Sequence, residues 1–248
     1  KVIFLDDLYR LGQGFLKQYP DRFEEEIAHS SPKETAILVY TSGTTGPPKG
    51  AMISHENIIV SVIGAVITLP VTEQDEQVCF LPLCHILERL ISVFIPVAYG
   101  SVVNFAESPE TVFDNLREVS PHVFTAVPRV WEKVFSRITI MAGEATSLGR
   151  VSYGLALKTG MKRAKLIEEG QPIPAGTRMA YAFWDFFVLN NLRRMLGLHR
   201  LRRGTTGAAP ISPDLLRWFR AIGVTVLEGY GMTESSGVIS VNLIERQK

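Results

Sequence analysis

Short apolar runs alternate with longer helical patterns along most of this chain. Runs rich in β-branched and aromatic residues predict strands at residues 35–40, 77–83, 100–105, 122–127, 201–207, 224–230 and 237–243. Apolar positions spaced three and four apart predict helices at residues 56–68, 86–97, 109–119, 128–141 and 213–222, with Ser212 as the N-cap of the last. This alternation predicts an α/β fold of largely parallel sheets with flanking helices.

Residues 149–198 depart from this alternation, because they are helical in pattern apart from a turn at residues 169–176. Two helices are therefore predicted as an insert. The second, residues 179–196, is apolar on nearly every side, so it is either buried or in contact with lipid. It leads into a basic group made up of Arg193, Arg194, His199, Arg200, Arg202 and Arg203. Such a group predicts peripheral binding to anionic lipid, and interior packing with paired arginines is the alternative.

Composition places the chain among folded globular proteins. Its 248 residues are 46% hydrophobic, which is enough for a sizeable core. A net charge of +1 gives no reason to expect a nucleic-acid partner. The two cysteines, Cys79 and Cys84, are too few for a disulfide framework and indicate a reducing compartment, so we expect a cytoplasmic protein. No transmembrane helix is predicted, because the longest charge-free stretch is interrupted by Pro96 and Gly100.

The stretch "YTSGTTGPPKG", residues 40–50, predicts a loop, because Gly and Pro interrupt both helix and strand. Glycines let backbone N–H groups approach phosphate oxygens, hydroxyls add donors and a lysine meets the charge. A Walker A loop is excluded, since Pro48 and Gly50 stand where that motif needs its second Gly and its Ser or Thr. A phosphate cradle and a plain surface connection are both compatible with this loop alone. The candidate phosphate-binding residues are Thr41, Ser42, Gly43, Thr44, Thr45, Gly46 and Lys49.

Three further segments appear in order: "FLPLCHILER" at 80–89, "TTGAAPIS" at 205–212 and "GYGMTESSG" at 229–237. Together with the loop, they resemble the adenylate-forming (AMP-binding) superfamily. The segment "FLPLCHILER" and the helical insert are most similar to those of long-chain fatty acyl-CoA synthetases. The resemblance implies that residues 1–248 form the central part of the large N-terminal domain. Members of that family continue into a lid domain carrying the lysine that promotes adenylation, so the chain alone is expected to have little activity.

The resemblance also implies roles for individual residues. Lys49 and its loop would hold the β- and γ-phosphates of ATP, Thr233 would donate to the α-phosphate and Glu234 would ligate Mg²⁺. Tyr230 would stack on adenine. The remaining nucleotide-binding residues would be Gly207, Ala208, Ala209, Gly229, Gly231 and Met232. Ala208 departs from the family pattern, in which a Gly is commoner.

The implied reaction converts ATP and a long-chain fatty acid into acyl-adenylate and pyrophosphate, after which coenzyme A displaces AMP. Lys49, Thr233, Glu234 and His85 would be its catalytic residues. An aryl or medium-chain acid ligase is the alternative within the enzyme class. A nucleotide- or acyl-binding module without turnover is the alternative outside it.

Two residues near the expected acyl site have competing interpretations. His85 would position the acyl carboxylate, which needs no base because it is already ionised at neutral pH. A zinc site with Cys79 and Cys84 is the alternative, but the spacing matches no usual zinc pattern and a fourth ligand is missing. Trp131 would line or gate an apolar tunnel, or it packs in the core as most aromatic residues at such spacing do.

Overall fold

The structure is a computed structural model that describes residues 2–41 and 47–242. Its elements follow in the order α1 (Leu5–Gln18), α2 (Arg22–His29), β1 (Thr35–Thr41), β2 (Lys49–Ser54), α3 (His55–Thr68), β3 (Glu76–Cys79), α4 (Ile86–Arg89), the π-helix η1 (Leu90–Phe94), α5 (Ile95–Tyr99), β4 (Val102–Phe105), α6 (Val112–Val119), β5 (Val123–Ala126), α7 (Pro128–Glu144), α8 (Ser147–Glu168), α9 (Ala175–Trp184), the π-helix η2 (Asp185–Leu189), α10 (Asn190–Met195), β6 (Arg203–Thr206), α11 (Pro213–Ala221), β7 (Val226–Met232), the 3₁₀ turn η3 (Thr233–Ser235) and β8 (Gly237–Val241).

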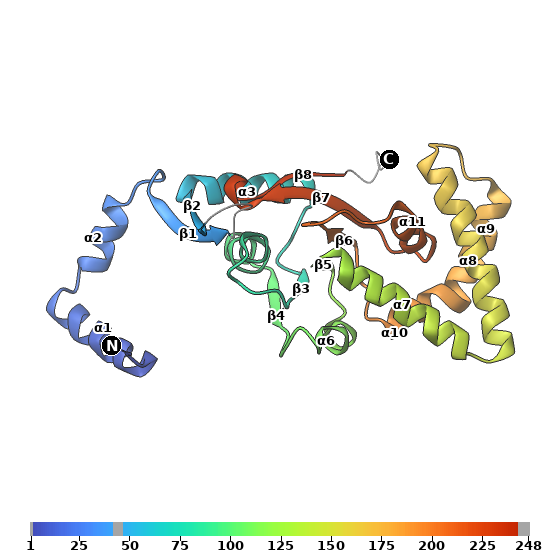
Figure 1. Ribbon diagram of the computed structural model, residues 1–248, viewed down its shortest axis with the longest axis horizontal. Coiled ribbons are helices and arrows are strands. Elements are labelled where there is room, and N and C mark those ends of the chain that lie inside the picture. Colours follow the sequence, from blue (N-terminus) through green and yellow to red (C-terminus); the bar gives the residue numbers. More distant parts are fainter. Residues whose placement is uncertain (1, 42–46, 243–248) are drawn as a thin grey trace.

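The strands form three small sheets. The largest has the order β5-β6-β7-β8, in which β5, β6 and β7 are parallel and β8 returns antiparallel to β7. Strands β3 and β4 form a parallel pair, and β1 and β2 an antiparallel hairpin. Helices flank these sheets, so the predicted α/β class is confirmed (Figure 1). Strand β2 was not predicted, because it is short and follows directly on a loop rich in Gly and Pro.

The main core lies between the four-stranded sheet and helices α6, α7 and α11. At its centre, Trp131 of α7 meets Phe124 of β5 and Phe219 of α11 edge to face, with ring centroids 5.5 and 5.1 Å apart. Edge-to-face pairs of this kind contribute about 0.5–1.5 kcal/mol beyond the area that they bury. These aromatic contacts therefore hold helices α7 and α11 against one face of the four-stranded sheet.

The insert packs on this core and forms one end of the molecule (Figure 1). Helix α8 crosses α11 so closely that a Cβ on Gly160 would lie 2.2 Å from the carbonyl oxygen of Ala221. The helix predicted to be apolar on every side is divided into α9, η2 and α10. Leu189 is fully buried, whereas Phe186 and Phe187 are 71% and 58% exposed. This helix therefore has one core face and one exposed aromatic face.

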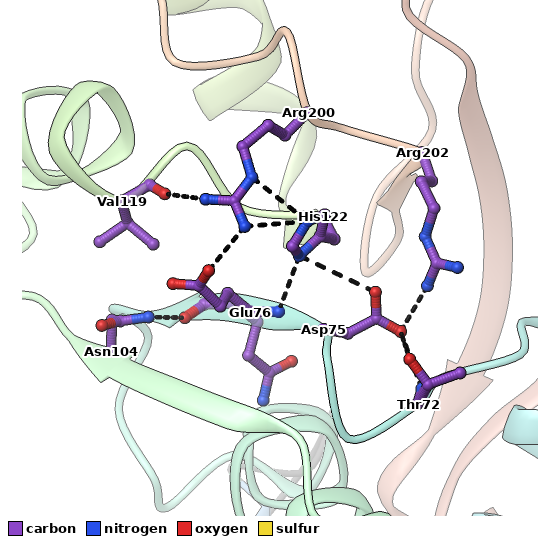
Figure 2. A network of polar contacts seen from close by, with 9 residues as sticks. Thr72, Asp75, Glu76, Asn104, Val119, His122, Arg200 and Arg202 are labelled. Carbon is purple, nitrogen blue, oxygen red and sulfur yellow. Dashed lines mark hydrogen bonds and ion pairs between the residues drawn. The ribbon is translucent and has the colours of Figure 1, made fainter.

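Much of the basic group after this helix is paired inside the protein. Arg193 forms a bidentate pair with Asp185, at 2.6 and 3.1 Å. Figure 2 shows that Arg200 donates to Glu76, at 2.7 Å, and that Arg202 pairs with Asp75. Three of the five arginines are thus paired with carboxylates, whereas Arg194 is exposed and makes no ion pair with any described residue. Binding of this group to anionic lipid stays a prediction.

The contacts in Figure 2 join the amino ends of three strands from two sheets. Glu76 begins β3, His122 immediately precedes β5 and Arg202 immediately precedes β6. The backbone N–H of Glu76 donates to Nδ1 of His122, at 3.1 Å, and Arg200 contacts the other ring nitrogen. Asp75, which is 3% exposed, also accepts from the N–H and hydroxyl of Thr72. We call these residues the amino-end network.

Candidate active site

A cavity of about 660 Å³ lies toward the carboxyl ends of β6 and β7. Polar and glycine-rich residues at the carboxyl ends of these strands, and just after them, form one part of its wall. Helix α3, the helix that runs from α4 into α5, and strand β8 form the other part, which is mostly apolar. The predicted site residues that line it are His85, Gly207, Ala208, Gly229, Tyr230, Gly231, Met232 and Thr233. The structure thus brings together residues from three of the four sequence segments.

The polar part of the wall depends on close backbone approach. A Cβ on Gly207 would lie 3.0 Å from the carbonyl oxygen of Gly229, and one on Gly231 would lie 1.9 Å from that of Gly237. Larger residues at these positions would force the segments apart. Ala208 has a φ of 68°, in the left-handed region that favours glycine, so alanine there strains the backbone. Ala209 is exposed and does not line the cavity.

Thr206 also lines the cavity, and no feature of the sequence singled it out as a site residue. The hydroxyl of Thr206, at the end of β6, is buried and has no hydrogen-bond partner among the residues that the structure describes. Its neighbour Thr205 contacts the Thr125 hydroxyl across the sheet and is satisfied. A buried hydroxyl without a partner costs about 1–3 kcal/mol unless another group completes it. Thr206 therefore fits a polar ligand in the cavity.

The apolar part of the wall comes from two helices that face each other. Val60 and Ala65 lie on α3, and Ile86, Leu90 and Ile95 lie on the opposing helix. That helix contains the π-turn η1, and such turns are frequent at functional sites. His85 is the N-cap residue of the same helix and lines the cavity, whereas Cys84 next to it does not. The wall suits a hydrocarbon chain.

A buried acidic group supports this helix from behind. Glu88 is 3% exposed and accepts a hydrogen bond of 2.7 Å from the Ser92 hydroxyl. Burial raises the pKa of Glu88, and burial together with Glu88 raises the pKa of the Cys79 thiol to about 11. Both groups are therefore held toward their protonated forms. Among residues 2–41 and 47–242, no group of three or more His, Cys, Asp or Glu could hold a metal ion, so the zinc alternative finds no ligand set there.

Trp131 does not line the cavity. It is fully buried, and its Nε1–H donates to the carbonyl oxygen of Thr205 at 3.2 Å. A Cβ on Gly204 would lie 2.6 Å from its ring, so the indole fills the space that this glycine leaves. The structure places Trp131 in the core and not at a gate.

The candidate phosphate loop is described only at its ends. Thr41 and Lys49 face each other across the β1–β2 hairpin, both flanking the loop. Ser42, Gly43, Thr44, Thr45 and Gly46 lie outside the described residues. Lys49 is exposed, and β2 contacts η3, the turn that carries Thr233 and Glu234. The strand that carries Lys49 and this turn are therefore neighbours, although Lys49 and Glu234 do not line the cavity itself.

Comparison with known proteins agrees with this arrangement. The model of a family described as AMP-binding enzyme matches residues 6–248. The chain belongs to the AMP-binding enzyme family. Long-chain-fatty-acid–CoA ligase ACSBG2 of Gallus gallus is 37% identical to it over 233 residues, which cover 90% of this chain and 30% of that protein.

Solved structures of other proteins share the fold. The o-succinylbenzoate CoA synthetase of Bacillus subtilis in complex with AMP has a TM-score of 0.55 and 24% identity, over 87% of this chain and 41% of that one. A malonyl-CoA ligase in a ternary product complex with methylmalonyl-CoA and AMP has a TM-score of 0.56 and 21% identity, over 88% and 37%. The chain therefore spans less than half of each of these AMP-binding proteins and of the Gallus gallus ligase.

Proposed function

We propose that the protein activates a long-chain fatty acid with ATP, first to an acyl-adenylate and then to an acyl-CoA. The observation that carries this proposal is one cavity with two kinds of wall, glycine-lined and polar at one side and apolar at the other. The first suits a nucleotide and the second a hydrocarbon chain. Similarity to a long-chain-fatty-acid–CoA ligase supports the same conclusion.

In the first step, a carboxylate oxygen of the acid attacks the α-phosphorus of ATP. The bond to the β-phosphate oxygen breaks, and pyrophosphate leaves with the electron pair. An anion must approach a polyanion, so the main task of the protein is to supply positive charge and hydrogen-bond donors. Lys49 and the loop between β1 and β2 are the proposed donors to the β- and γ-phosphates. Thr233 and the unpaired hydroxyl of Thr206 are the proposed donors inside the cavity.

The remaining roles follow from position. Tyr230, which is 60% exposed and lines the cavity, is the proposed stacking surface for adenine, and Gly207 and Ala208 leave room beside it. His85 lies where the apolar wall begins, so it is the proposed contact for the acyl carboxylate. Glu234 makes no ion pair with any described residue and is the proposed magnesium ligand. Magnesium there would neutralise phosphate charge.

In the second step, the thiol of coenzyme A loses its proton and its sulfur attacks the acyl carbonyl carbon. The bond between that carbon and the adenylate oxygen breaks, and AMP leaves. We place residues 1–248 within a larger adenylation domain, with the helical insert at about 149–198, in a cytoplasmic protein. A lid domain beyond this chain would complete the site for both steps.

The experiment that tests this proposal is acid-dependent release of pyrophosphate by the full-length protein. Acids from acetate to long-chain fatty acids, together with benzoate, are compared at equal ATP and coenzyme A. We expect kcat/KM to rise with chain length, because each buried CH₂ contributes ~0.8 kcal/mol. A maximum at benzoate or at a medium chain would favour the alternative ligases, and no release with any acid would favour a binding module.

Peripheral contact with a membrane is part of the same proposal, now based on the exposed aromatic face of the insert. Phe183, Phe186 and Phe187 are exposed beside Met179, and Arg178 is exposed nearby. In the described residues no helix is long and apolar enough to cross a membrane. Co-sedimentation of the full-length protein with phosphatidylserine vesicles tests this contact. Binding that is equal in wild type and Phe186→Ser/Phe187→Ser would exclude this face.

A further inference from the structure

A second cavity, of about 350 Å³, lies between the insert and α11 and shares no lining residue with the first. Its wall carries three arginines: Arg163 of α8, Arg193 of α10 and Arg220 of α11. Tyr181 of α9 and Asp185 of η2 complete the polar lining. The cavity is thus formed by side chains from five different elements, and none of them belongs to the proposed active site.

Positive charge exceeds negative charge around this cavity. Asp185, the one carboxylate in the lining, is fully engaged by Arg193. The nearest further carboxylate, Glu168, lies 3.6 Å from Arg220 but makes its shorter contact, 2.7 Å, with Arg217 outside the cavity. Arg163 makes no ion pair with any residue that the structure describes. Its guanidinium lies over the Tyr181 ring, 4.5 Å from the centroid.

The pKa shifts of Arg220 and Tyr181 are consistent with a site that binds an anion. Burial and the positive charges of Arg217 and Arg163 lower the pKa of Arg220, while Glu168 opposes this effect. Burial raises the pKa of Tyr181, so its hydroxyl keeps its proton at neutral pH and can donate. Each guanidinium has five N–H donors and no acceptor. The cavity therefore offers more donors than the carboxylates near it can satisfy.

The floor of the cavity is shaped for close approach. Gly223 has a φ of 83°, and a Cβ there would lie 2.5 Å from Nη1 of Arg193 and 3.0 Å from the Tyr181 hydroxyl. Nη1 of Arg193 also donates to the carbonyl oxygen of Ile222, at 2.7 Å. The glycine thus leaves space for the guanidinium and the hydroxyl to meet above the backbone that leads into β7.

We propose that this cavity binds a phosphate group, either the free dianion or a phosphate monoester. Guanidinium groups match phosphate oxygens in geometry and form charge-assisted hydrogen bonds with them. Arg163, Arg193 and Arg220 reach the space from three helices, which suits a tetrahedral oxyanion better than a planar carboxylate. The bound anion holds the insert against α11 and the start of β7.

Isothermal titration of the full-length protein with inorganic phosphate, at constant ionic strength, tests this site. Arg163→Gln removes the arginine that has no carboxylate partner among the described residues. Lys162→Gln removes an equal charge from the next, exposed position on the same helix. Lys49→Ala weakens phosphate binding at the proposed active site and leaves this cavity intact. We expect phosphate binding at this cavity to persist in Lys162→Gln and in Lys49→Ala, and to be weakened about tenfold or more in Arg163→Gln.

Other outcomes would overturn the proposal. Absence of binding in Lys49→Ala would assign all phosphate binding to the active site. Equal weakening by Lys162→Gln and Arg163→Gln would mean that phosphate responds only to the overall positive charge and not to this cavity. If Arg163→Gln does not fold, Arg163→Lys keeps the charge, loses the planar fork and should still bind phosphate more weakly than wild type.

Competition experiments distinguish the possible sources of the phosphate group. Displacement of inorganic phosphate by glycerol 3-phosphate would identify a soluble ester as the ligand. Displacement by vesicles containing phosphatidic acid would identify a lipid headgroup.

Discussion

The two ends of the parallel strands are built in opposite ways. Toward the carboxyl ends of β6 and β7, glycine segments bend around a cavity, and the buried hydroxyl of Thr206 has no partner in the described part of the chain. At the amino ends, Arg200 and Arg202 pair with Glu76 and Asp75 in the amino-end network (Figure 2). The Thr206 hydroxyl is thus left incomplete where a ligand is expected, whereas Asp75 and Glu76 are paired where the sheet is held together. Changes at the carboxyl ends should affect activity, and changes at the amino ends should affect stability.

The largest effect is expected from Lys49→Ala near the carboxyl ends. Loss of a charge that meets the developing phosphate charge should lower the rate of acid-dependent pyrophosphate release about 10²–10³-fold, by analogy with removal of one donor from an oxyanion hole. The urea midpoint should stay unchanged, because Lys49 is exposed. Lys33→Ala, an exposed lysine just before β1, is the matched control. Full activity of Lys49→Ala would remove the loop from the proposed site.

The second prediction concerns the amino-end network. Asp75 is buried and accepts from Thr72 and Arg202, so Asp75→Ala leaves a guanidinium and an N–H without their acceptor. Breaking a buried pair costs about 3–5 kcal/mol, and we expect roughly 2 kcal/mol here because Arg202 is 48% exposed. Urea unfolding of the full-length protein measures this loss, and Glu107→Ala, at an exposed acid, is the control. A large loss of kcat at unchanged stability would contradict the division between the two ends.

These two ends also differ in how far the sequence predicts them. The site segments are contiguous, so the resemblance of "GYGMTE" and "TTGAAPIS" to the motifs of a known family predicted residues that the structure places around one cavity. The amino-end network joins residues that are more than a hundred positions apart, and no local pattern pairs Arg200 with Glu76. The α/β class, in contrast, could be predicted from the alternation of β-branched and helical segments, because each element depends mostly on nearby residues.

What the sequence left open or missed has physical causes of the same kind. Thr205 and Thr206 are identical in the sequence, and only the pairing of β6 with β5 decides that the first is satisfied and the second is left over. Trp131 is one aromatic residue on an amphipathic helix, and the space beside Gly204 decides that it fills the core. The left-handed backbone at Ala208 likewise has no signal in a sequence that carries alanine there.

The third prediction tests whether the apolar wall selects the acid. Gly64 of α3 lines the cavity, and a Cβ placed on it would meet no other atom within 4 Å, so the leucine side chain of Gly64→Leu would enter the space proposed for the acyl chain. We expect kcat/KM for the longest acids to fall about tenfold and the preferred chain to shorten, because ~0.8 kcal/mol is lost for each CH₂ displaced. Gly154→Leu is the control, because Gly154 is an exposed position of α8 and a Cβ there also meets no other atom within 4 Å. An unchanged chain-length profile would place the acyl chain elsewhere.

The smallest effect is expected from Glu88, which supports the acyl wall from behind. Burial raises its pKa above the ordinary value of 4.5, so the folded protein holds a proton that the unfolded chain releases. The free energy of unfolding contributed by this group therefore falls as pH rises from that ordinary value through the folded pKa. Glu88→Gln cannot ionise and can still accept from the Ser92 hydroxyl. We expect it to lose less stability than wild type between pH 5 and pH 7, within the range over which carboxyl groups titrate.

Urea unfolding of the full-length protein at these two pH values measures the difference. Glu107→Gln removes an exposed carboxyl and should follow the wild type. Parallel losses in Glu88→Gln and wild type would mean that Glu88 is ionised in the folded state, and its hydrogen bond with Ser92 would then be charge-assisted. A smaller loss of unfolding free energy in Glu88→Gln alone would show that Glu88 is a neutral acid, buried beside the cavity at a cost in stability. The comparison of the two strand ends would then include this helix as a third region.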